Sequence, residues 1–292
     1  MMSDGARRTI QANGRELSYL AWGSPALPPM VFVHGFMGAA SNFWEVATAL
    51  EAEFRVFAPD LRGHGFSAWD PDGDYSMESY QRDLVAWTAA LGLSRFVLCG
   101  HSLGGPTVAI YAARHPEQVV RLILEDPARF GSNQRAPQSP TGTTPRGQGG
   151  LFPELPLAFP SWAEAEKAGM AAIASPRPTK ESNDRYLESN LLRHPDGHVT
   201  WRLDRAGLMA WLAAGDPLDG EALSPFVEQL RCPTLVLRGA SSMIAAEPLR
   251  RLAALNPCVT YQEIAGAGHG IHFDQPDVFL SALRGFIRQP LP

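Results

Sequence analysis

Short, uninterrupted hydrophobic runs alternate with amphipathic segments along most of the chain. The runs lie at residues 30–33, 54–58, 96–99, 122–124, 234–237 and 259–264. Runs of this length are typical of strands that are covered on both faces. Apolar residues at helical spacing follow them at residues 42–53, 79–91, 103–114, 248–255 and 276–287. The alternation predicts an α/β fold with a mostly parallel sheet and helices on both faces.

Two further patterns depart from this alternation. Near the N-terminus, alternating segments on either side of Asn13-Gly14 predict a β-hairpin. After the run at 122–124, the next strand pattern comes only after residue 230, and helices are expected at 163–173, 183–193 and 204–214. We therefore predict an α/β core from residues 1–128 and 230–292 and a mainly helical cap insertion at 129–229. Residues 131–150, rich in Pro, Gly, Ser and Thr, are expected to form a mobile loop.

Composition and charge exclude several classes of protein. The formal net charge is −5 and no block of Lys or Arg stands out, so we expect no nucleic-acid partner. The three cysteines, Cys99, Cys232 and Cys258, are widely spaced and form no zinc pattern, which favours a reducing compartment. No leader-like segment and no apolar run of about 18 residues is visible. We expect a cytoplasmic protein without membrane contact, metal or cofactor.

The most informative motif is Gly100-His101-Ser102-Leu103-Gly104. It follows one predicted strand and opens a predicted helix, which is the context that a G-x-S-x-G nucleophile elbow requires. Such a turn exposes the serine hydroxyl at the end of the strand, beside the N–H groups of the following helix. Ser102 is therefore the candidate nucleophile.

A second glycine-containing turn, residues 34–38, follows the strand at 30–33. A loop in this place can supply one backbone donor of an oxyanion hole, and the residue after the nucleophile supplies the other. These donors would be the N–H groups of Phe36 and Leu103.

The candidate base stands near the C-terminus, in Gly266-Ala267-Gly268-His269. A loop after the last strand can bring an imidazole to the nucleophile, where it takes the serine proton. We favour His269, which comes first after the strand, and His272 is the alternative.

Four motifs occur together in this order: HGFMG at 34–38, PDLRGHGFS at 59–67, GHSLGG at 100–105 and GAGH at 266–269. In this order they resemble the α/β-hydrolase fold family over nearly the whole chain. The resemblance implies a serine hydrolase that works through an acyl-enzyme. It also implies that Asp60 and Arg62 belong to a structural turn and not to the catalytic site.

The sequence departs from that family where most members carry the triad acid. The loop at 238–244 has no carboxylate, and Met243 stands where the acid is usual. A minority of the family, including the hydrolase of 2-(acetamidomethylene)succinate and zearalenone lactonase, carry the acid after an earlier strand. Asp126, which lies 24 residues after Ser102, matches that position. Glu125 is the alternative, and strand alternation lets only one of the two face the histidine.

The resemblance and the motifs together predict a hydrolase of a small, apolar or aromatic carboxylic ester or lactone, with an amide as a further option. Within the same fold, a C–C bond hydrolase or a perhydrolase is the alternative, and a non-catalytic ligand receptor is the alternative from another class. The partner is a small-molecule substrate, and the oligomeric state stays open. Residues near the catalytic loops and in the insertion are candidates for its pocket: Met37, His101, Phe130, Trp162, Trp211 and Met243.

Overall fold

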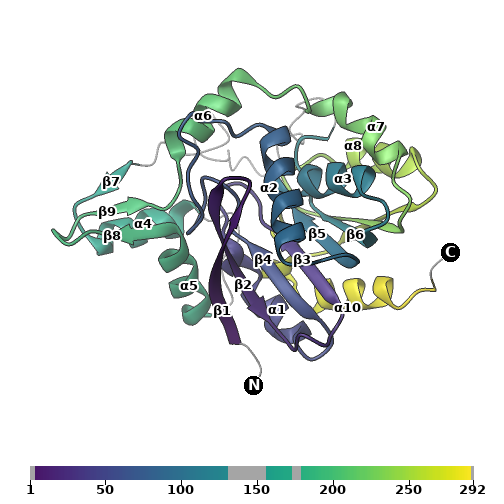
Figure 1. The fold of residues 1–292 in the computed structure, drawn as a ribbon, viewed down its shortest axis with the longest axis horizontal. Helices are drawn as coiled ribbons and strands as arrows, with labels where there is room; N and C mark the ends of the chain where they lie inside the picture. Colours follow the sequence, from purple (N-terminus) through teal and green to yellow (C-terminus); the bar gives the residue numbers. More distant parts are fainter. Residues whose placement is uncertain (1–3, 131–155, 173–178, 291–292) are drawn as a thin grey trace.

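The computed structural model describes residues 4–130, 156–172 and 179–290 (Figure 1). Eight strands form one sheet. In spatial order they are β1 (Asp4–Ala12), β2 (Arg15–Trp22), β4 (Arg55–Pro59), β3 (Pro29–Val33), β5 (Phe96–His101), β6 (Val119–Glu125), β10 (Thr234–Gly239) and β11 (Val259–Ile264). Neighbours from β4 to β11 pair in parallel, whereas the β1–β2 hairpin and the β2–β4 pair are antiparallel. The predicted mostly parallel sheet is confirmed.

The uninterrupted apolar runs are explained by two separate hydrophobic layers, one on each face of the sheet. In β3, Val31 and Val33 belong to one layer, while Met30 and Phe32 belong to the other. All four side chains are completely buried. Because successive side chains of a strand point to opposite faces, a strand covered on both sides has no position left for a polar residue.

Helices cover both faces of the sheet (Figure 1). One layer is closed by α2 (Met77–Ala90), α3 (Gly104–Arg114) and α8 (Ala246–Ala254). The other is closed by the 3-10 turn η1 (Ala40–Phe43), α1 (Trp44–Leu50), α9 (Ile271–Asp274) and α10 (Pro276–Ile287). None of the helices in the ranges described combines the length and the apolar character that crossing a membrane requires.

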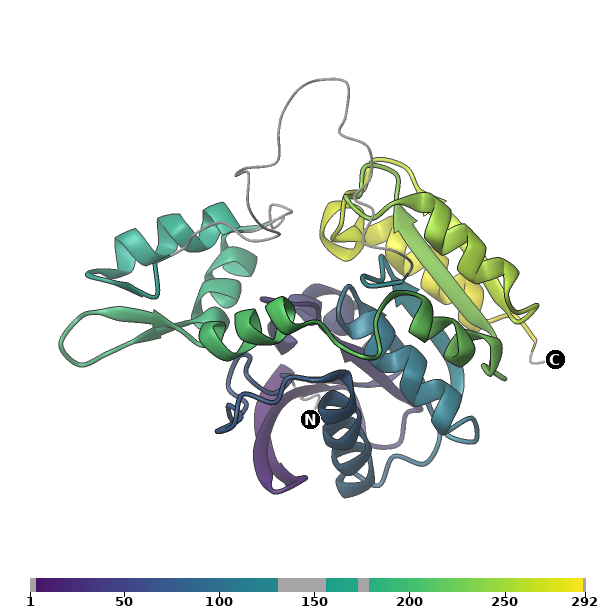
Figure 2. The same cartoon turned by 90° about the horizontal axis from the view of Figure 1, so that it is seen from above.

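An extension between β6 and β10 projects to one side of the sheet and then returns across the core, where its last helix packs against α3 (Figures 1 and 2). Its described elements are β7 (Ala158–Phe159), α4 (Trp162–Ala172), α5 (Lys180–Asn190), β8 (Leu191–Arg193), β9 (Val199–Trp201), α6 (Arg205–Ala214), η2 (Gly220–Leu223) and α7 (Ser224–Glu228). The helices expected at 163–173 and 204–214 correspond to α4 and α6. The loop predicted at 131–150 lies outside the described residues.

The helix predicted at 183–193 is wrong in its last turn. Helix α5 ends at Asn190, and the next three residues form β8, which pairs antiparallel with β9; β7 pairs with the other edge of β9. The hairpin turn contains Pro195-Asp196-Gly197, with Gly197 at a φ of +90°. Pro, Asp and Gly in sequence are a turn signal, so this hairpin could have been found from the residues alone.

Helix α6 is attached to the core at both ends. At its start, Asp204 caps the helix by accepting the Gly207 N–H, and its Oδ2 accepts a hydrogen bond of 2.6 Å from the Tyr75 hydroxyl. Beyond its end, Asp216 Oδ2 accepts the backbone N–H of Met77 at 2.8 Å and the indole N–H of Trp211 at 2.9 Å. Both attachments lie at the start of α2, so α6 is held over the core by carboxylates and not only by apolar contact.

A buried ion network supports the turn that follows β4. The Arg62 side chain is only 1% exposed. Its Nε and Nη2 donate to the two carboxylate oxygens of Asp83 at 2.5 and 2.7 Å, and its Nη1 donates to Asp70 at 3.0 Å. Arg62 is thus a structural residue, as the sequence predicts.

Asp83→Ala is expected to lower the free energy of unfolding by about 3–5 kcal/mol, because it leaves a buried guanidinium without its bidentate partner. Urea denaturation followed by circular dichroism measures the change. Glu78→Ala is the control, since it removes an ion pair with Arg114 whose side chains are 48% and 36% exposed. That change is expected to cost at most about 1 kcal/mol. Equal losses in the two variants would contradict a structural role for the buried network.

Candidate active site

Ser102 lies in a sharp turn between β5 and α3. Its φ is +52°, a left-handed conformation that costs energy in a residue other than glycine and that recurs at functional sites. The turn needs glycine at 104, since a Cβ there would come 2.2 Å from the carbonyl oxygen of Val33. The Ser102 N–H donates to the carbonyl of Glu125 at 3.0 Å, so the turn is also tied to the neighbouring strand.

The structure brings Ser102, His269 and Asp126 into one hydrogen-bonded line. His269 Nε2 lies 2.9 Å from Ser102 Oγ, and His269 Nδ1 lies 2.6 Å from Asp126 Oδ2. An ionised carboxylate can only accept, so Nδ1 carries the proton and Nε2 faces the serine hydroxyl as an acceptor. The Asp126 side chain is completely buried, whereas the His269 side chain keeps 16% of its surface exposed.

The alternative residues, Glu125 and His272, are paired with each other. Glu125 Oε1 accepts the His272 backbone N–H at 2.9 Å and lies 2.7 Å from His272 Nδ1. Burial raises the pKa of Glu125. The His272 ring stacks on Phe43 at 4.8 Å between ring centroids. This pair is buried, and the two adjacent acids, the last residue of β6 and the residue after it, contact different histidines.

Asp126 is held by groups that sequence reasoning missed. Its φ is +41°, so it turns sharply after β6, as Ser102 does after β5. Its Oδ1 accepts the Gly239 N–H at 3.2 Å, and its Oδ2 accepts a short hydrogen bond from the hydroxyl of Ser242. Gly239 ends β10 and Ser242 lies in the loop that follows it, which was noted in the sequence for its missing carboxylate and for Met243. A hydroxyl in that loop was the available signal.

The loop at 34–38 lies directly against the nucleophile. A Cβ on Gly35 would come 2.7 Å from the Cβ of Ser102. His34 fixes the loop from below: its Nε2 accepts the Leu61 N–H at 2.9 Å, so its Nδ1 donates to the carbonyl of Gly35 at 2.8 Å. Burial lowers the pKa of His34, which keeps this neutral form. Phe36 follows in the loop, and Leu103 begins the helix on the other side of Ser102.

His101 supports the loop that carries His269. Its side chain is buried, and its Nε2 donates to the His269 carbonyl at 2.8 Å. Burial lowers the pKa of His101 to about 3, so the imidazole is neutral at physiological pH. The rings of His101 and His269 lie 4.8 Å apart between centroids. His101, expected in the substrate pocket, thus contacts the candidate base directly.

The remaining pocket candidates occupy different environments. Phe130 is buried, and Met37 is half-buried against the same hydrophobic layer. Trp211 is also buried, with the Arg129 guanidinium 4.6 Å above its ring. Met243 is 48% exposed in the loop after β10. Among these four residues, Met243 therefore has the largest exposed fraction.

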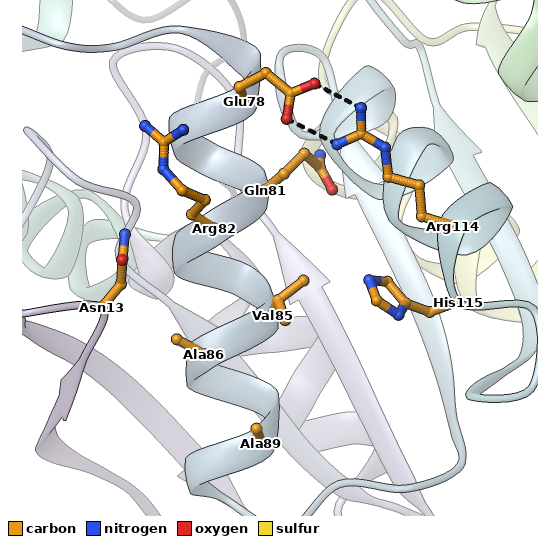
Figure 3. Close-up of a pocket in the computed structure, with 9 residues that line it drawn as sticks. All are labelled: Asn13, Glu78, Gln81, Arg82, Val85, Ala86, Ala89, Arg114 and His115. Carbon is orange, nitrogen blue, oxygen red and sulfur yellow. Dashed lines mark hydrogen bonds and ion pairs between the residues drawn. The ribbon is translucent and has the colours of Figure 1, made fainter.

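Among the described residues, cavities occur away from Ser102. One of about 330 Å³ lies between α2 and α3, beside the ion pair of Glu78 and Arg114 (Figure 3). Another, of about 260 Å³, lies in the extension and is lined by Trp162 and Arg193, whose guanidinium stacks 3.6 Å from the Trp162 ring centroid. Trp162, expected in the substrate pocket, is among the residues that line this second cavity. Within the described ranges, no group of His, Cys, Asp and Glu is arranged to hold a metal ion.

Comparison with known proteins gives a consistent picture. The model of the alpha/beta hydrolase fold family matches residues 28–276. The sn-1-specific diacylglycerol lipase ABHD11 of Mus musculus is 32% identical over 285 residues, which cover 93% of this chain and 85% of the relative. N-formylmaleamate deformylase of Pseudomonas putida is 27% identical over 283 residues, covering 97% of this chain and 96% of the relative.

Solved structures agree with the family match. E-2-(acetamidomethylene)succinate hydrolase superposes with a TM-score of 0.72 at 23% identity, covering 97% of this chain and 99% of the other. At that identity the likeness concerns the fold alone. Together with the family match and the lipase relative, it confirms the resemblance noted in the motifs. The chain therefore belongs to the α/β hydrolase fold family and is a hydrolase.

Proposed function

We propose that the protein is a serine hydrolase of small carboxylic esters or lactones, with Ser102 as nucleophile, His269 as general base and Asp126 as the orienting acid. The observation that carries the proposal is the hydrogen-bonded line from Ser102 Oγ through His269 to Asp126, at 2.9 and 2.6 Å. Nucleophile, base and orienting acid within hydrogen-bond distance are the signature of an activated serine.

In the first half of the reaction, Ser102 Oγ attacks the substrate carbonyl and His269 Nε2 takes the hydroxyl proton. The N–H groups of Phe36 and Leu103 are the donors expected to stabilise the negative charge on the carbonyl oxygen, because Gly35 lies against Ser102 and Leu103 is the N-cap residue of α3. Asp126 stabilises the imidazolium without taking its proton. His269 then gives that proton to the leaving oxygen as the carbon–oxygen bond breaks.

In the second half, water resolves the acyl-enzyme. His269 removes a proton from water, the hydroxide attacks the acyl carbonyl, and the bond to Ser102 Oγ breaks. The proton returns to Ser102, so the enzyme ends as it began. The products are a carboxylic acid and an alcohol, or a hydroxy acid when the substrate is a lactone.

We also propose that residues 129–229 form a cap over the site. The segment leaves the core directly after Asp126 and Pro127, at the carboxyl end of β6. Ligands of open α/β sheets bind outside the carboxyl ends of the strands. Its aromatic residues, among them Phe130 and Trp211, favour an apolar or aromatic acyl group. A cytoplasmic location remains a prediction from the sequence.

The test combines a covalent probe with a substrate series. A fluorophosphonate is expected to label Ser102, and p-nitrophenyl esters of graded acyl length are expected to release p-nitrophenol, with a chain-length optimum that measures the pocket. Mass spectrometry of the labelled peptide identifies the nucleophile. A wild-type protein that neither reacts with the probe nor turns over any ester would contradict the proposal and favour a ligand receptor.

An amide substrate is the second candidate. It is favoured by the deformylase relative, which matches 97% of this chain. The same nucleophile, base and oxyanion donors cleave amides when the base protonates the leaving nitrogen. Turnover of N-formyl or N-acyl substrates, with labelling of Ser102 but without ester hydrolysis, would favour this candidate over the first.

A further inference from the structure

The buried side chain of Arg238 holds the loop that follows β10 through an ion pair and several hydrogen bonds. The Arg238 side chain is 8% exposed and pairs with Glu263 at 3.0 Å. It also donates to three backbone carbonyls of the loop, those of Ala240 at 3.4 Å, Ser242 at 3.2 Å and Ile244 at 2.8 Å. A charged, branched donor bound to several carbonyls holds the backbone of this segment in one conformation.

The fixed loop presents one hydroxyl to the candidate acid. Ser242 is buried, and its Oγ accepts the Ile244 N–H at 3.0 Å. That bond occupies one lone pair and directs the hydroxyl proton toward Asp126 Oδ2, the oxygen that also binds His269 Nδ1. With the Gly239 N–H on Oδ1, the buried carboxylate receives three donors.

We infer that Ser242 is a positioning residue that acts through Asp126, by holding the carboxylate aimed at His269. The inference rests on the proposed serine-hydrolase function. A completely buried carboxylate stays charged only when donors replace the water that it has lost. The His269 imidazole supplies one donor, the last residue of β10 supplies the second, and the loop after β10 supplies the third. In this chain, the loop that holds the triad acid in most members of the family would therefore hold the acid's hydrogen-bond donor.

The backbone conformation of Asp126 is a second reason why the carboxylate needs these hydrogen-bond donors. Its φ of +41° is unfavourable for a residue with a side chain, so the backbone alone does not favour the orientation of the carboxylate. The adjacent Ser241 provides a matched comparison, because it is exposed while Ser242 is buried. The two serines of this loop thus differ in burial and in the contacts that Ser242 makes with Ile244 and Asp126.

The experiment compares Ser242→Ala, Ser242→Thr and Ser241→Ala in the full-length protein. Ser242→Ala is expected to slow phosphonylation of Ser102 by a fluorophosphonate, and to lower kcat on an ester, by about tenfold to a hundredfold, the range for a hydrogen bond to a charged group. KM is expected to change by less than about twofold, because Ser242 acts on the acid and not on substrate binding. Ser242→Thr retains the hydroxyl and is expected to recover most of the rate, and Ser241→Ala is expected to match the wild type.

A double-mutant cycle decides whether Ser242 acts through Asp126. In an Asp126→Asn background, Ser242→Ala is expected to cause almost no further loss of rate, because the two residues act as one unit. Fully additive losses would overturn the inference and assign Ser242 a general structural role, as would a wild-type rate in Ser242→Ala.

Proton NMR separates this inference from the proposed function. The His269–Asp126 hydrogen bond is expected to give a far-downfield resonance that Ser242→Ala shifts or broadens and Ser241→Ala leaves in place. A protein that does not react with the fluorophosphonate but shows this change would contradict the proposed function and support the positioning role. An unchanged resonance in Ser242→Ala, in a protein that does react, would overturn only the positioning role.

Discussion

Ser102→Ala is expected to lower kcat on a carboxylic ester by on the order of a million-fold, the loss seen when a triad serine is removed. The substitution deletes the only atom that bonds to the substrate in the proposed mechanism, and His269 is left with no hydroxyl to activate. Turnover of a p-nitrophenyl ester, measured against the rate in buffer, gives the size of the loss. The remaining acceleration then measures the oxyanion donors and substrate binding alone.

The fold of this variant is expected to be unchanged. Ser102 is buried at a φ of +52°, a conformation that alanine adopts at a similar cost, so the melting temperature is expected to stay within a few degrees of wild type. A variant that melts like the wild type and keeps more than about one part in a hundred of its activity would contradict a serine nucleophile. Such a result would direct attention to a water attack assisted by His269.

Asp126→Asn is expected to lower kcat by about 10⁴-fold, as the loss of the carboxylate does in a Ser-His-Asp triad of known mechanism. The amide is the same size but carries no charge, and its NH₂ group can donate where the carboxylate only accepts. His269 Nδ1, now 2.6 Å from Oδ2, would then favour the tautomer with the proton on Nε2, which cannot accept the proton of Ser102. The ester assay used for Ser102→Ala measures the loss.

Glu125→Gln is the matched control for this acid. The two carboxylates are adjacent and both completely buried, but Glu125 lies against His272 and not against His269. Glu125→Gln is expected to keep kcat within about tenfold of wild type, because its effect on His269 passes only through the packing of the loop. The reverse order of damage would assign the triad acid to Glu125.

Much of the fold was predictable because each central strand is buried on both faces. Uninterrupted apolar runs then mark the strands, as at Met30–Val33, and the glycines around Ser102 mark the turn that must follow one of them. The order of the motifs also indicated the family, because each loop that forms the site follows a particular strand. The small sheet of the extension was missed, since three-residue strands are too short to show a period.

The sequence narrowed the candidates for the acid to two neighbouring residues, Glu125 and Asp126, but could not decide between them. Alternation in β6 predicts that Glu125 and Asp126 point to opposite sides, but it does not tell which side His269 occupies. Only the packing of the last loop against β6 decides that Asp126 lies beside His269. The contribution of Ser242 was not predictable for the same reason, because 116 residues separate it from the carboxylate that it contacts.

The early position of the acid places most of the site in one continuous segment. Ser102, Leu103 and Asp126 all lie between the start of β5 and the residue after β6, in a single strand–helix–strand unit. The Ser102 N–H and carbonyl bond to Glu125 and Ala128, so the two turns brace each other within it. Contacts of short sequence separation form early in folding. In the proposed mechanism, local contacts within this unit bring the nucleophile and its acid together, while His269 and the donors of Gly239 and Ser242 reach them from the C-terminal part of the chain.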